Sequence, residues 1–345
     1  MKNIFGWLTQ NQAWQKIGIL VVLGVAVHLI FPQITSLGNS WQVLTSMALW
    51  AVGLAFIAQI LSYLGSGYLL QSILAIAHQK VSLWLNTLIV LGSYSIGMVA
   101  GGVIGSSVAI YRWTSGGKGS MEGATLASIF LPQFNTIILV LISIFGLVHL
   151  ILVHSLTQVQ LVGFGMTLLI LVLIIGSAAL AVRFRNLATK AIIWMSSRVA
   201  RLRRKSIDPD ATRKEASDLF GAWDALWQGG WHRPVVGAFL NIAFDMLTLD
   251  FLFIAAGENV SLGVLLAGYG LPLLLGKVAF IIPGGVGVVE SSMAVLYNGM
   301  GVPQATTVVV VLGYRLISFW LPSLLGFAAA AYLSRKSSSV SSRGD

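Results

Sequence analysis

The chain has 345 residues, of which 57% are hydrophobic and 9% are charged, whereas an ordinary soluble domain carries about 25% charged residues. So few charged residues cannot cover the surface of a soluble protein of this size, and the apolar side chains must therefore face lipid. The formal net charge is +10 and cysteine is absent, which excludes disulfide frameworks, thiol catalysis and cysteine-ligated metals. The composition predicts a membrane protein.

Eight stretches of the chain are apolar enough to be embedded in a bilayer, where one helical span needs about 20 residues. In chain order they are 17–31, 43–70, 83–111, 124–152, 161–183, 233–256, 261–299 and 304–334. Tryptophans lie at or near the ends of several stretches, where the amphipathic indole ring prefers the membrane interface. We therefore expect an all-α polytopic membrane protein with one membrane domain over 1–345, and we take 17–31 as a retained first span.

Two of these stretches cannot be simple spans. Stretch 261–299 has 39 residues, and a continuous helix of that length would measure about 58 Å against a hydrocarbon core of about 30 Å. It contains Pro272, Pro283 and the pair Gly284 and Gly285, all of which bend or break helices. Stretch 83–111 is rich in glycine near its middle. Each stretch is therefore predicted to form two half-helices joined at a glycine turn.

Basic residues concentrate between Arg183 and Arg233, a segment that holds 11 of the 21 lysines and arginines together with five of the 11 acids. Lysine and arginine close to a membrane span favour the cytoplasmic side. Segment 186–205 is amphipathic and basic and is expected to lie on the cytoplasmic surface. We expect anionic lipid to bind the basic segment 183–205, and we expect no nucleic-acid partner.

The distribution of charge also predicts the topology. If both broken stretches return to the side from which they enter and the other six cross fully, 19 of the 21 basic residues and both termini are cytoplasmic. The other two, Lys277 and Arg315, lie inside apolar stretches. A full crossing by 83–111 would instead place Arg112 and Lys118 outside. The positive-inside rule therefore favours about six full spans plus two re-entrant hairpins.

The two predicted hairpins resemble each other. The first reads AGGVIGSSVAIY from Ala100 and the second PGGVGVVESSMAVLY from Pro283, and the predicted topology makes them enter from opposite sides. This pattern is typical of inverted repeats in secondary transporters, where broken helices meet near the midplane. A seam of closely packed helices would use the same glycines. The expected organisation is 43–183 as first repeat half, 184–232 as cytoplasmic basic amphipathic loop, 233–334 as second half and 335–345 as disordered cytoplasmic tail.

Three segments resemble the transmembrane region of lysylphosphatidylglycerol synthases, a flippase-like membrane family: IIPGGVGVVESSMAVLY (281–297), VLGYRLISFWLPSLLGFAAAAYL (311–333) and, more weakly, YRWTSGGKGSMEGATLASI (111–129). The resemblance implies a multi-pass protein of the bacterial cell (inner) membrane that moves a lipid with a polar headgroup between leaflets. The soluble synthase domain of full-length members has no counterpart in the sequence, so we expect no lipid aminoacylation by this chain.

The match to the family is stronger in the second half. Glu290 and Arg315 agree with its motifs. In the first half, Ala100, Ser106 and Ala109 stand where the family usually has proline, an acid and arginine, and the pair Pro132 and Gln133 replaces a frequent Glu-Arg pair. The polar groups of the first half are thus neutralised in this chain.

Ionisable residues inside the membrane are the main functional candidates, because Asp, Lys or Arg at the centre of a span costs about 2.5–3.5 kcal/mol. Arg315 is suited to bind phosphate through its fork of N–H groups, and a structural ion pair with Glu290 is equally compatible with the sequence. The candidate substrate-binding residues are Glu290, Arg315, Gly284, Gly285, Gly101, Gly102, Arg112, Lys277 and Asp245.

The sequence therefore predicts a transporter that moves a membrane phospholipid or lipid-linked substrate, and it predicts no catalytic residue, metal or cofactor. A lipid phosphate would rest near the half-helix amino termini at Gly102 and Gly285. Two alternatives stay open: a non-transporting accessory subunit of an envelope lipid or glycan pathway, and a membrane enzyme whose turnover depends on Glu290 or Asp245. The sequence is also compatible with a homo-oligomer.

Overall fold

The computed structural model describes residues 37–100, 102–115, 120–152, 183–202, 230–278 and 283–341, with single positions or short runs between 162 and 228. These residues form helices and no strands. The predicted first span, 17–31, lies outside the described residues, as does most of the predicted span 161–183.

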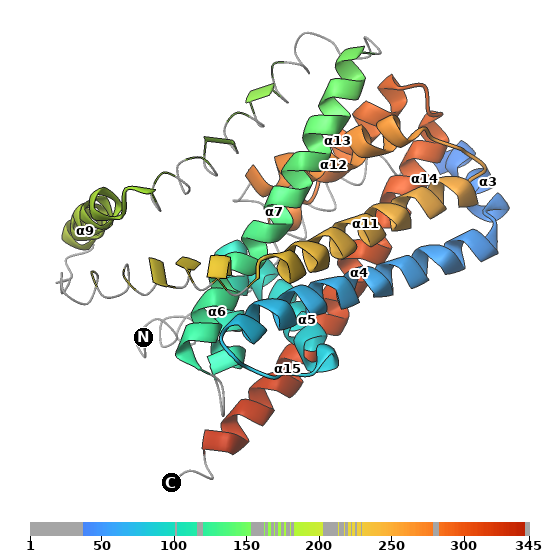
Figure 1. Cartoon of the computed structure of the whole chain (residues 1–345). Helices are drawn as coiled ribbons and strands as arrows, with labels where there is room; N and C mark the ends of the chain where they lie inside the picture. Colours follow the sequence, from blue (N-terminus) through green and yellow to red (C-terminus); the bar gives the residue numbers. More distant parts are fainter. Residues whose placement is uncertain are drawn as a thin grey trace.

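The helices follow one another in a simple order (Figure 1). They are α3 (Leu37–Ser46), α4 (Leu49–Ile76), α5 (Leu83–Val99), α6 (Val103–Ser115), α7 (Met121–Leu152), α9 (Arg185–Leu202), α11 (His232–Ala255), α12 (Leu262–Val278), α13 (Val288–Gly299), α14 (Gln304–Arg315) and α15 (Leu321–Ser341). A single turn of 3-10 helix, Pro283–Gly285, precedes α13, and a π-helical segment, Leu316–Trp320, joins α14 to α15.

Four described helical segments are long and apolar enough to cross a membrane: Leu49–Ile76, Met121–Leu152, His232–Ala255 and Gln304–Arg335. They coincide with four of the six predicted full spans, and the multi-pass all-α class is confirmed. The last helix continues to Ser341, so the beginning of the predicted disordered tail, from 335, is helical.

The first broken stretch is a helical hairpin. Helices α5 and α6 pack against each other and are joined by a turn in which Gly102 has φ +64°, a left-handed conformation that favours glycine. A Cβ at Gly97 would lie 2.6 Å from the carbonyl oxygen of Gly102 and would also meet the Ser106 side chain. The absence of a side chain at Gly97 therefore lets the two half-helices approach closely.

The second broken stretch is also a hairpin, formed by α12 and α13. Its turn contains three glycines with positive φ, Gly284, Gly285 and Gly287. Gly268 lies so close to the ring of Tyr297 that any side chain there would clash. Both predictions of half-helices joined at a glycine turn are thus confirmed.

Helices α4 and α11 form the central seam of the bundle, and they run antiparallel. The Ala48 N–H donates to the Ala255 carbonyl at one end, with an N to O distance of 2.8 Å. Near the middle, a Cβ at Gly65 would be 2.7 Å from the Asn241 backbone nitrogen. Small residues at this seam allow the two backbones to approach, as is common between membrane helices.

Each hairpin packs on a long helix from the other half of the chain. Helix α5 packs on α15, where the Ser95 hydroxyl donates to the Ser323 carbonyl at 2.7 Å. Helix α12 packs on α7, where Gly270 faces Ser143. Figure 1 shows the α5/α6 hairpin and the α12/α13 hairpin at opposite ends of the bundle. These reciprocal, antiparallel relations are those expected of an inverted repeat.

The same packing brings the two hairpins together. Helix α5 runs antiparallel to α15, with Gly92 beside Ala330 and Ser95 beside Ser323. If the same antiparallel pairing continues to Val99 at the end of α5, that end lies near Phe319, in the segment before α15. The Phe319 ring in turn lies against Gly284. Helix α5 accordingly contacts the turn Pro283–Gly285. The carboxyl end of the first half-helix thus meets the turn of the second hairpin inside the bundle.

Candidate polar site at the second hairpin turn

A buried ion pair lies at the turn of the second hairpin. The Nε of Arg315, at the end of α14, donates to Glu290 Oε1 at 2.6 Å. Glu290 is 1% exposed and Arg315 is 5% exposed. Two charges buried so deeply are tolerated because each offsets the desolvation of the other. The structure therefore brings together the two predicted residues that match the family motifs.

Glu290 also fixes the start of its own helix. Its Oε2 accepts a hydrogen bond from the Gly287 N–H at 2.6 Å, and Glu290 lies in the first turn of α13. A carboxylate in this position satisfies a free backbone donor and is stabilised by the positive end of the helix dipole. The amino terminus that the sequence assigns to a lipid phosphate is thus already occupied by a carboxylate in this structure.

Arg315 ties α14 to the glycine turn. Its Nη2 donates to the Gly284 carbonyl at 2.9 Å, and its guanidinium lies 4.2 Å from the centre of the Phe319 ring. Gly284 has φ +64°, and a Cβ on it would clash with that ring. Arg315, Phe319 and Gly284 therefore form one packed unit, and glycine is required at 284 for both reasons.

A π-helical segment begins directly after Arg315 and covers Leu316–Trp320. Such segments insert an extra residue into a helix and often occur at functional sites. Here the segment contains Phe319, so the irregular backbone carries the ring that covers the guanidinium. The helix irregularity and the charged pair therefore occur at the same place.

Asp245 on α11 lies beside this pair, within a second group of polar side chains. Its Oδ2 accepts hydrogen bonds from the Tyr314 hydroxyl at 2.6 Å and from the Tyr269 hydroxyl at 2.8 Å. The buried Gln59 side chain lies close to this carboxyl. Because Tyr314 precedes Arg315 in α14, neighbouring residues connect the two carboxylates of the site.

The polar group extends from Asp245 toward the first hairpin. The Tyr63 hydroxyl donates to the Ser318 carbonyl at 3.1 Å, and the Tyr63 and Tyr94 rings pack edge to face. The Asn135 amide donates to the Tyr94 hydroxyl at 3.5 Å. Helices α4, α5, α7, α11, α12 and α14 therefore all contribute polar side chains to the centre of the bundle.

Two amide oxygens in this region have no hydrogen-bond partner among the described residues, Gln59 Oε1 and Asn135 Oδ1. Both residues are buried. An unsatisfied buried polar atom costs about 1–3 kcal/mol, and such a cost in a native protein calls for a partner such as water or a ligand. The interior thus has capacity to bind further polar groups.

The family described as Lysylphosphatidylglycerol synthase TM region matches residues 16–326, which include both hairpins, the Glu290–Arg315 pair and the Asp245 group. The chain belongs to this family.

Three curated proteins that are similar to this chain are each described as a UPF0104 membrane protein. The chain is 25% identical to a UPF0104 membrane protein of Methanothermobacter thermautotrophicus over 232 residues, which are 66% of this chain and 68% of that protein. It is 33% identical to one of Methanocaldococcus jannaschii over 110 residues, 31% of this chain and 32% of that protein. A third, from Pyrococcus horikoshii, is 33% identical over 89 residues, 26% of each chain.

The other predicted site residues are spread over both hairpins. Lys277 is exposed near the end of α12, and Arg112 is exposed in the last turn of α6. Gly102 forms the first hairpin turn, and Gly101 lies outside the described residues. Gly285 lies in the second hairpin turn, where a Cβ would be 2.7 Å from Gly276. The predicted set is therefore only partly a single site.

The sequence did not identify the hydroxyl partners of Asp245. Tyr269 and Tyr314 are fully buried, and each lies in an apolar helix where a tyrosine can equally well belong to the core or to the interface. Their burial next to a carboxylate depends on how α11, α12 and α14 meet. The sequence does contain one signal for this contact, because Tyr314 directly precedes the predicted site residue Arg315.

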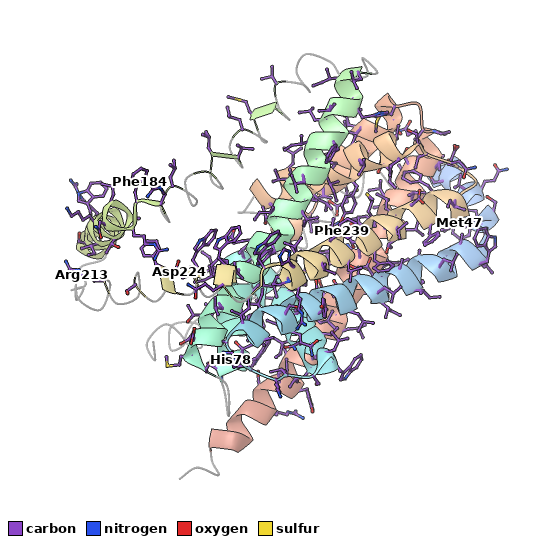
Figure 2. All side chains as sticks on the ribbon, viewed as in Figure 1. Met47, His78, Phe184, Arg213, Asp224 and Phe239 are labelled. Atoms are coloured by element: carbon purple, nitrogen blue, oxygen red, sulfur yellow. The ribbon has the colours of Figure 1, made fainter. Side chains whose placement is uncertain are left out.

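One ion pair lies away from the membrane bundle. The two terminal nitrogens of the Arg185 guanidinium, Nη1 and Nη2, both donate to the Asp224 carboxylate, with Nη1 to Oδ2 at 2.7 Å. The hydrogen bonds from Arg185 lower the pKa of Asp224, and Asp224 in turn raises the pKa of Arg185. Figure 2 shows Asp224 and Phe184 outside the group of helices that contains Phe239 and Met47. This contact connects α9 to the segment before α11.

Proposed function

We propose that this protein is a flippase-like transporter that moves a phospholipid headgroup between membrane leaflets through the polar interior where the two hairpins meet. The observation that carries the proposal is the buried Glu290–Arg315 pair at the second hairpin turn, in contact with the end of the first hairpin. Charged groups inside membrane bundles usually serve substrate or ion pathways.

The chemistry of Arg315 suits a lipid phosphate. Its Nε and Nη2 are engaged by Glu290 and Gly284, and Nη1 makes no hydrogen bond to any residue that the structure describes. A guanidinium can bind two phosphate oxygens at once. In this proposal a phosphate approaches Arg315 through Nη1 and competes with Glu290, which stays attached to the Gly287 N–H.

The polar group around Asp245 would supply the rest of the path. Tyr63, Tyr94, Asn135 and Gln59 provide hydroxyl and amide groups between the two hairpins. Such uncharged groups can exchange hydrogen bonds with a passing headgroup without holding it tightly. The acyl chains would stay in lipid, where the outer faces of the helices expose large apolar side chains.

Orientation and lipid contacts follow from the same proposal. The cations Lys80, Arg112, Arg233 and Arg335 occupy the same end of the bundle, at the ends or beginnings of α4, α6, α11 and α15. We assign this end, with both termini, to the cytoplasmic side of the cell membrane, where anionic lipids would also bind the basic helix α9. No catalytic step is assigned to the chain.

The test is transport by purified protein in liposomes that contain a fluorescent phospholipid in both leaflets. A membrane-impermeant reductant destroys fluorescence in the outer leaflet only, and transport makes the inner pool accessible. We expect the wild type to accelerate this second phase, and we expect Arg315→Gln and Glu290→Gln to reduce the rate at least about tenfold, the effect of losing one charge-assisted contact in the pathway.

The control is Arg185→Gln, which removes a cation that is paired outside the bundle. It should transport at the wild-type rate. Wild-type vesicles that lose fluorescence no faster than protein-free vesicles would reject the proposal. Melting temperatures of the variants in detergent separate a loss of transport from a loss of fold.

A second function is supported by the first half of the chain. Ala100, Ser106 and Ala109 carry no charge at the first hairpin, so the charges of the Glu290–Arg315 pair have no counterpart at these three positions. This asymmetry suits a non-transporting accessory subunit of a lipid or glycan pathway. Co-purification of a synthase by a protein that moves no lipid would favour that role.

A further inference from the structure

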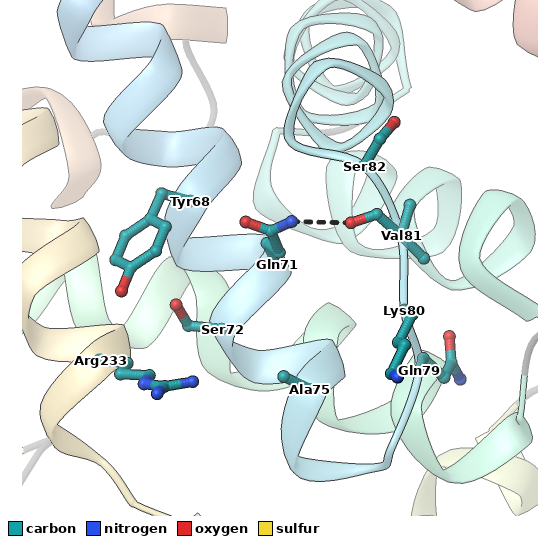
Figure 3. Close-up of a pocket in the computed structure, with 9 residues that line it drawn as sticks. All are labelled: Tyr68, Gln71, Ser72, Ala75, Gln79, Lys80, Val81, Ser82 and Arg233. Carbon is teal, nitrogen blue, oxygen red and sulfur yellow. Dashed lines mark hydrogen bonds between the residues drawn. The ribbon is translucent and has the colours of Figure 1, made fainter.

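A cavity of about 420 Å³ lies at the predicted cytoplasmic end of the bundle, away from the Glu290–Arg315 pair. Its walls come from the last turns of α4, from the link between α4 and α5, and from the first turn of α11 (Figure 3). The residues that give it chemical character are Tyr68, Ser72, Lys80 and Arg233.

The cavity is positively charged. Lys80 comes from the link and Arg233 from the start of α11, and none of the described residues that line the cavity is acidic. In the part of the chain that the structure describes, neither cation forms an ion pair. Two cations that share a cavity without an acid repel each other and attract an anion. The positive end of the α11 dipole, where Arg233 lies, adds to this attraction.

Two hydroxyl groups complete the lining. Ser72 is 5% exposed, and its Oγ has no hydrogen-bond partner among the described residues. Figure 3 shows the Tyr68 and Ser72 hydroxyls pointing toward the side of the cavity where the Arg233 guanidinium lies. A buried hydroxyl without a partner is costly, and a ligand oxygen at this point would satisfy it.

The walls of the cavity are held in place by the protein. The Gln71 side chain donates to the Val81 carbonyl at 2.8 Å, and the Gln79 side chain donates to the Ser120 hydroxyl at 2.7 Å. These bonds fix the link that carries Lys80 against α4 and the start of α7. A preformed site loses less entropy when it binds a ligand.

We infer that this cavity binds a phosphate group, held by Arg233, Lys80 and the hydroxyls of Ser72 and Tyr68. A phosphate offers several oxygens, which matches two cations and two hydroxyl donors better than a carboxylate does. The exposed apolar side chains of Leu83 and Trp84 follow the link, and Val236 lies one turn beyond Arg233. The cavity therefore opens at a level where a lipid phosphate or a soluble phosphate ester can reach it.

The inference is independent of lipid transport and is tested by binding. The protein is placed in nanodiscs of phosphatidylcholine and titrated with short-chain phosphatidylglycerol, and in a second arm with inorganic phosphate. Lys80→Gln and Arg233→Gln should each weaken saturable binding about tenfold, as expected for the loss of one charged phosphate contact. Ser72→Ala should weaken it less.

The matched control is Arg335→Gln, which removes an exposed cation at the same end of the bundle without altering the cavity. If Arg335→Gln weakened binding as much as Lys80→Gln or Arg233→Gln, the binding would reflect general attraction of anions, and the proposed site would be rejected. Competition by inorganic phosphate would support a soluble phosphate ester as ligand, and binding of the lipid alone would support a headgroup. No saturable binding of either probe would overturn the inference, and unchanged melting temperatures without ligand show that the variants fold.

Discussion

Tyr314 donates a 2.6 Å hydrogen bond to Asp245, while the next residue in the chain, Arg315, pairs with Glu290. One turn of α14 thus connects helix α11 to the second hairpin. The Asp245 carboxyl also accepts from Tyr269, so α11, α12 and α14 share one polar contact point. This arrangement fixes the relative positions of three helices around the proposed pathway.

Removal of one tyrosine hydroxyl should therefore weaken the fold. We expect Tyr314→Phe and Tyr269→Phe each to lower the free energy of unfolding by about 0.5–2 kcal/mol, the usual range for a lost hydrogen bond of this kind. The double variant should lose less than the sum, because both hydroxyls serve the same Asp245 oxygen. Thermal unfolding in detergent, followed by tryptophan fluorescence, measures this. Fully additive losses would contradict a shared contact.

The two hairpin turns offer a matched pair of glycines. Gly102 and Gly284 both have φ +64°, but a Cβ would meet nothing within 4 Å at Gly102 and would clash with the Phe319 ring at Gly284. Gly102→Ala should lower the free energy of unfolding by about 1–2 kcal/mol, because alanine disfavours the left-handed backbone conformation. Gly284→Ala should lower the free energy of unfolding by about 1–3 kcal/mol more than Gly102→Ala, because its Cβ would also clash with the Phe319 ring.

The comparison is made by melting temperature and repeated with Phe319→Ala, which removes the ring that a Cβ at 284 would meet. The double variant Gly284→Ala with Phe319→Ala should recover part of the difference from Gly102→Ala. Equal losses at the two glycines would show that the ring does not restrict the second turn.

The seam between α4 and α11 makes a further prediction. Gly65 lies against the Asn241 backbone, whereas Gly53 in the same helix has nothing within 4 Å of an added Cβ. Gly65→Ala should destabilise the protein by about 1–3 kcal/mol by separating the helices. Gly53→Ala should be neutral or stabilise by up to about 1 kcal/mol, because alanine favours helix more than glycine does. Thermal unfolding of the two variants distinguishes them, and a stable Gly65→Ala protein would contradict the close seam.

The direction of insertion can be tested because the chain lacks cysteine. Glu122 at the start of α7 and Asn298 near the end of α13 are both exposed, and they lie at opposite ends of the bundle. We expect single cysteines to react with an impermeant thiol reagent in intact cells at 298 and not at 122. After permeabilisation both should react. Labelling at 122 in intact cells would reverse the proposed orientation.

Much of the architecture could be predicted because it follows from local features. Hydropathy indicated the long spans, and the glycines and prolines around 284 and 272 indicated a broken helix, because no continuous helix of that length fits a bilayer. The partners of Asp245 could not be predicted in this way. Tyr269 and Tyr314 reach it only because three helices distant in sequence converge, and hydropathy does not report helix rotation.

The same reason explains the cavity at Lys80 and Arg233. These residues are 153 positions apart in the chain, and the antiparallel seam of α4 and α11 brings them together. Lys277 lies inside an apolar stretch of the sequence, and its side chain is exposed near the end of α12. A long flexible side chain in an apolar segment does not by itself indicate burial.

The reciprocal packing of the hairpins also has a consequence for how the protein is made. Helix α5 ends at Val99, but α15, on which it packs, begins at Leu321, more than 200 residues later. At a synthesis rate of about 5–20 residues per second, the first hairpin leaves the ribosome roughly 10–45 s before its packing surface exists. During biogenesis the polar backbone groups of its turn must be sheltered by the insertion machinery or by early helices, and a prematurely terminated product would be a natural target for membrane proteases.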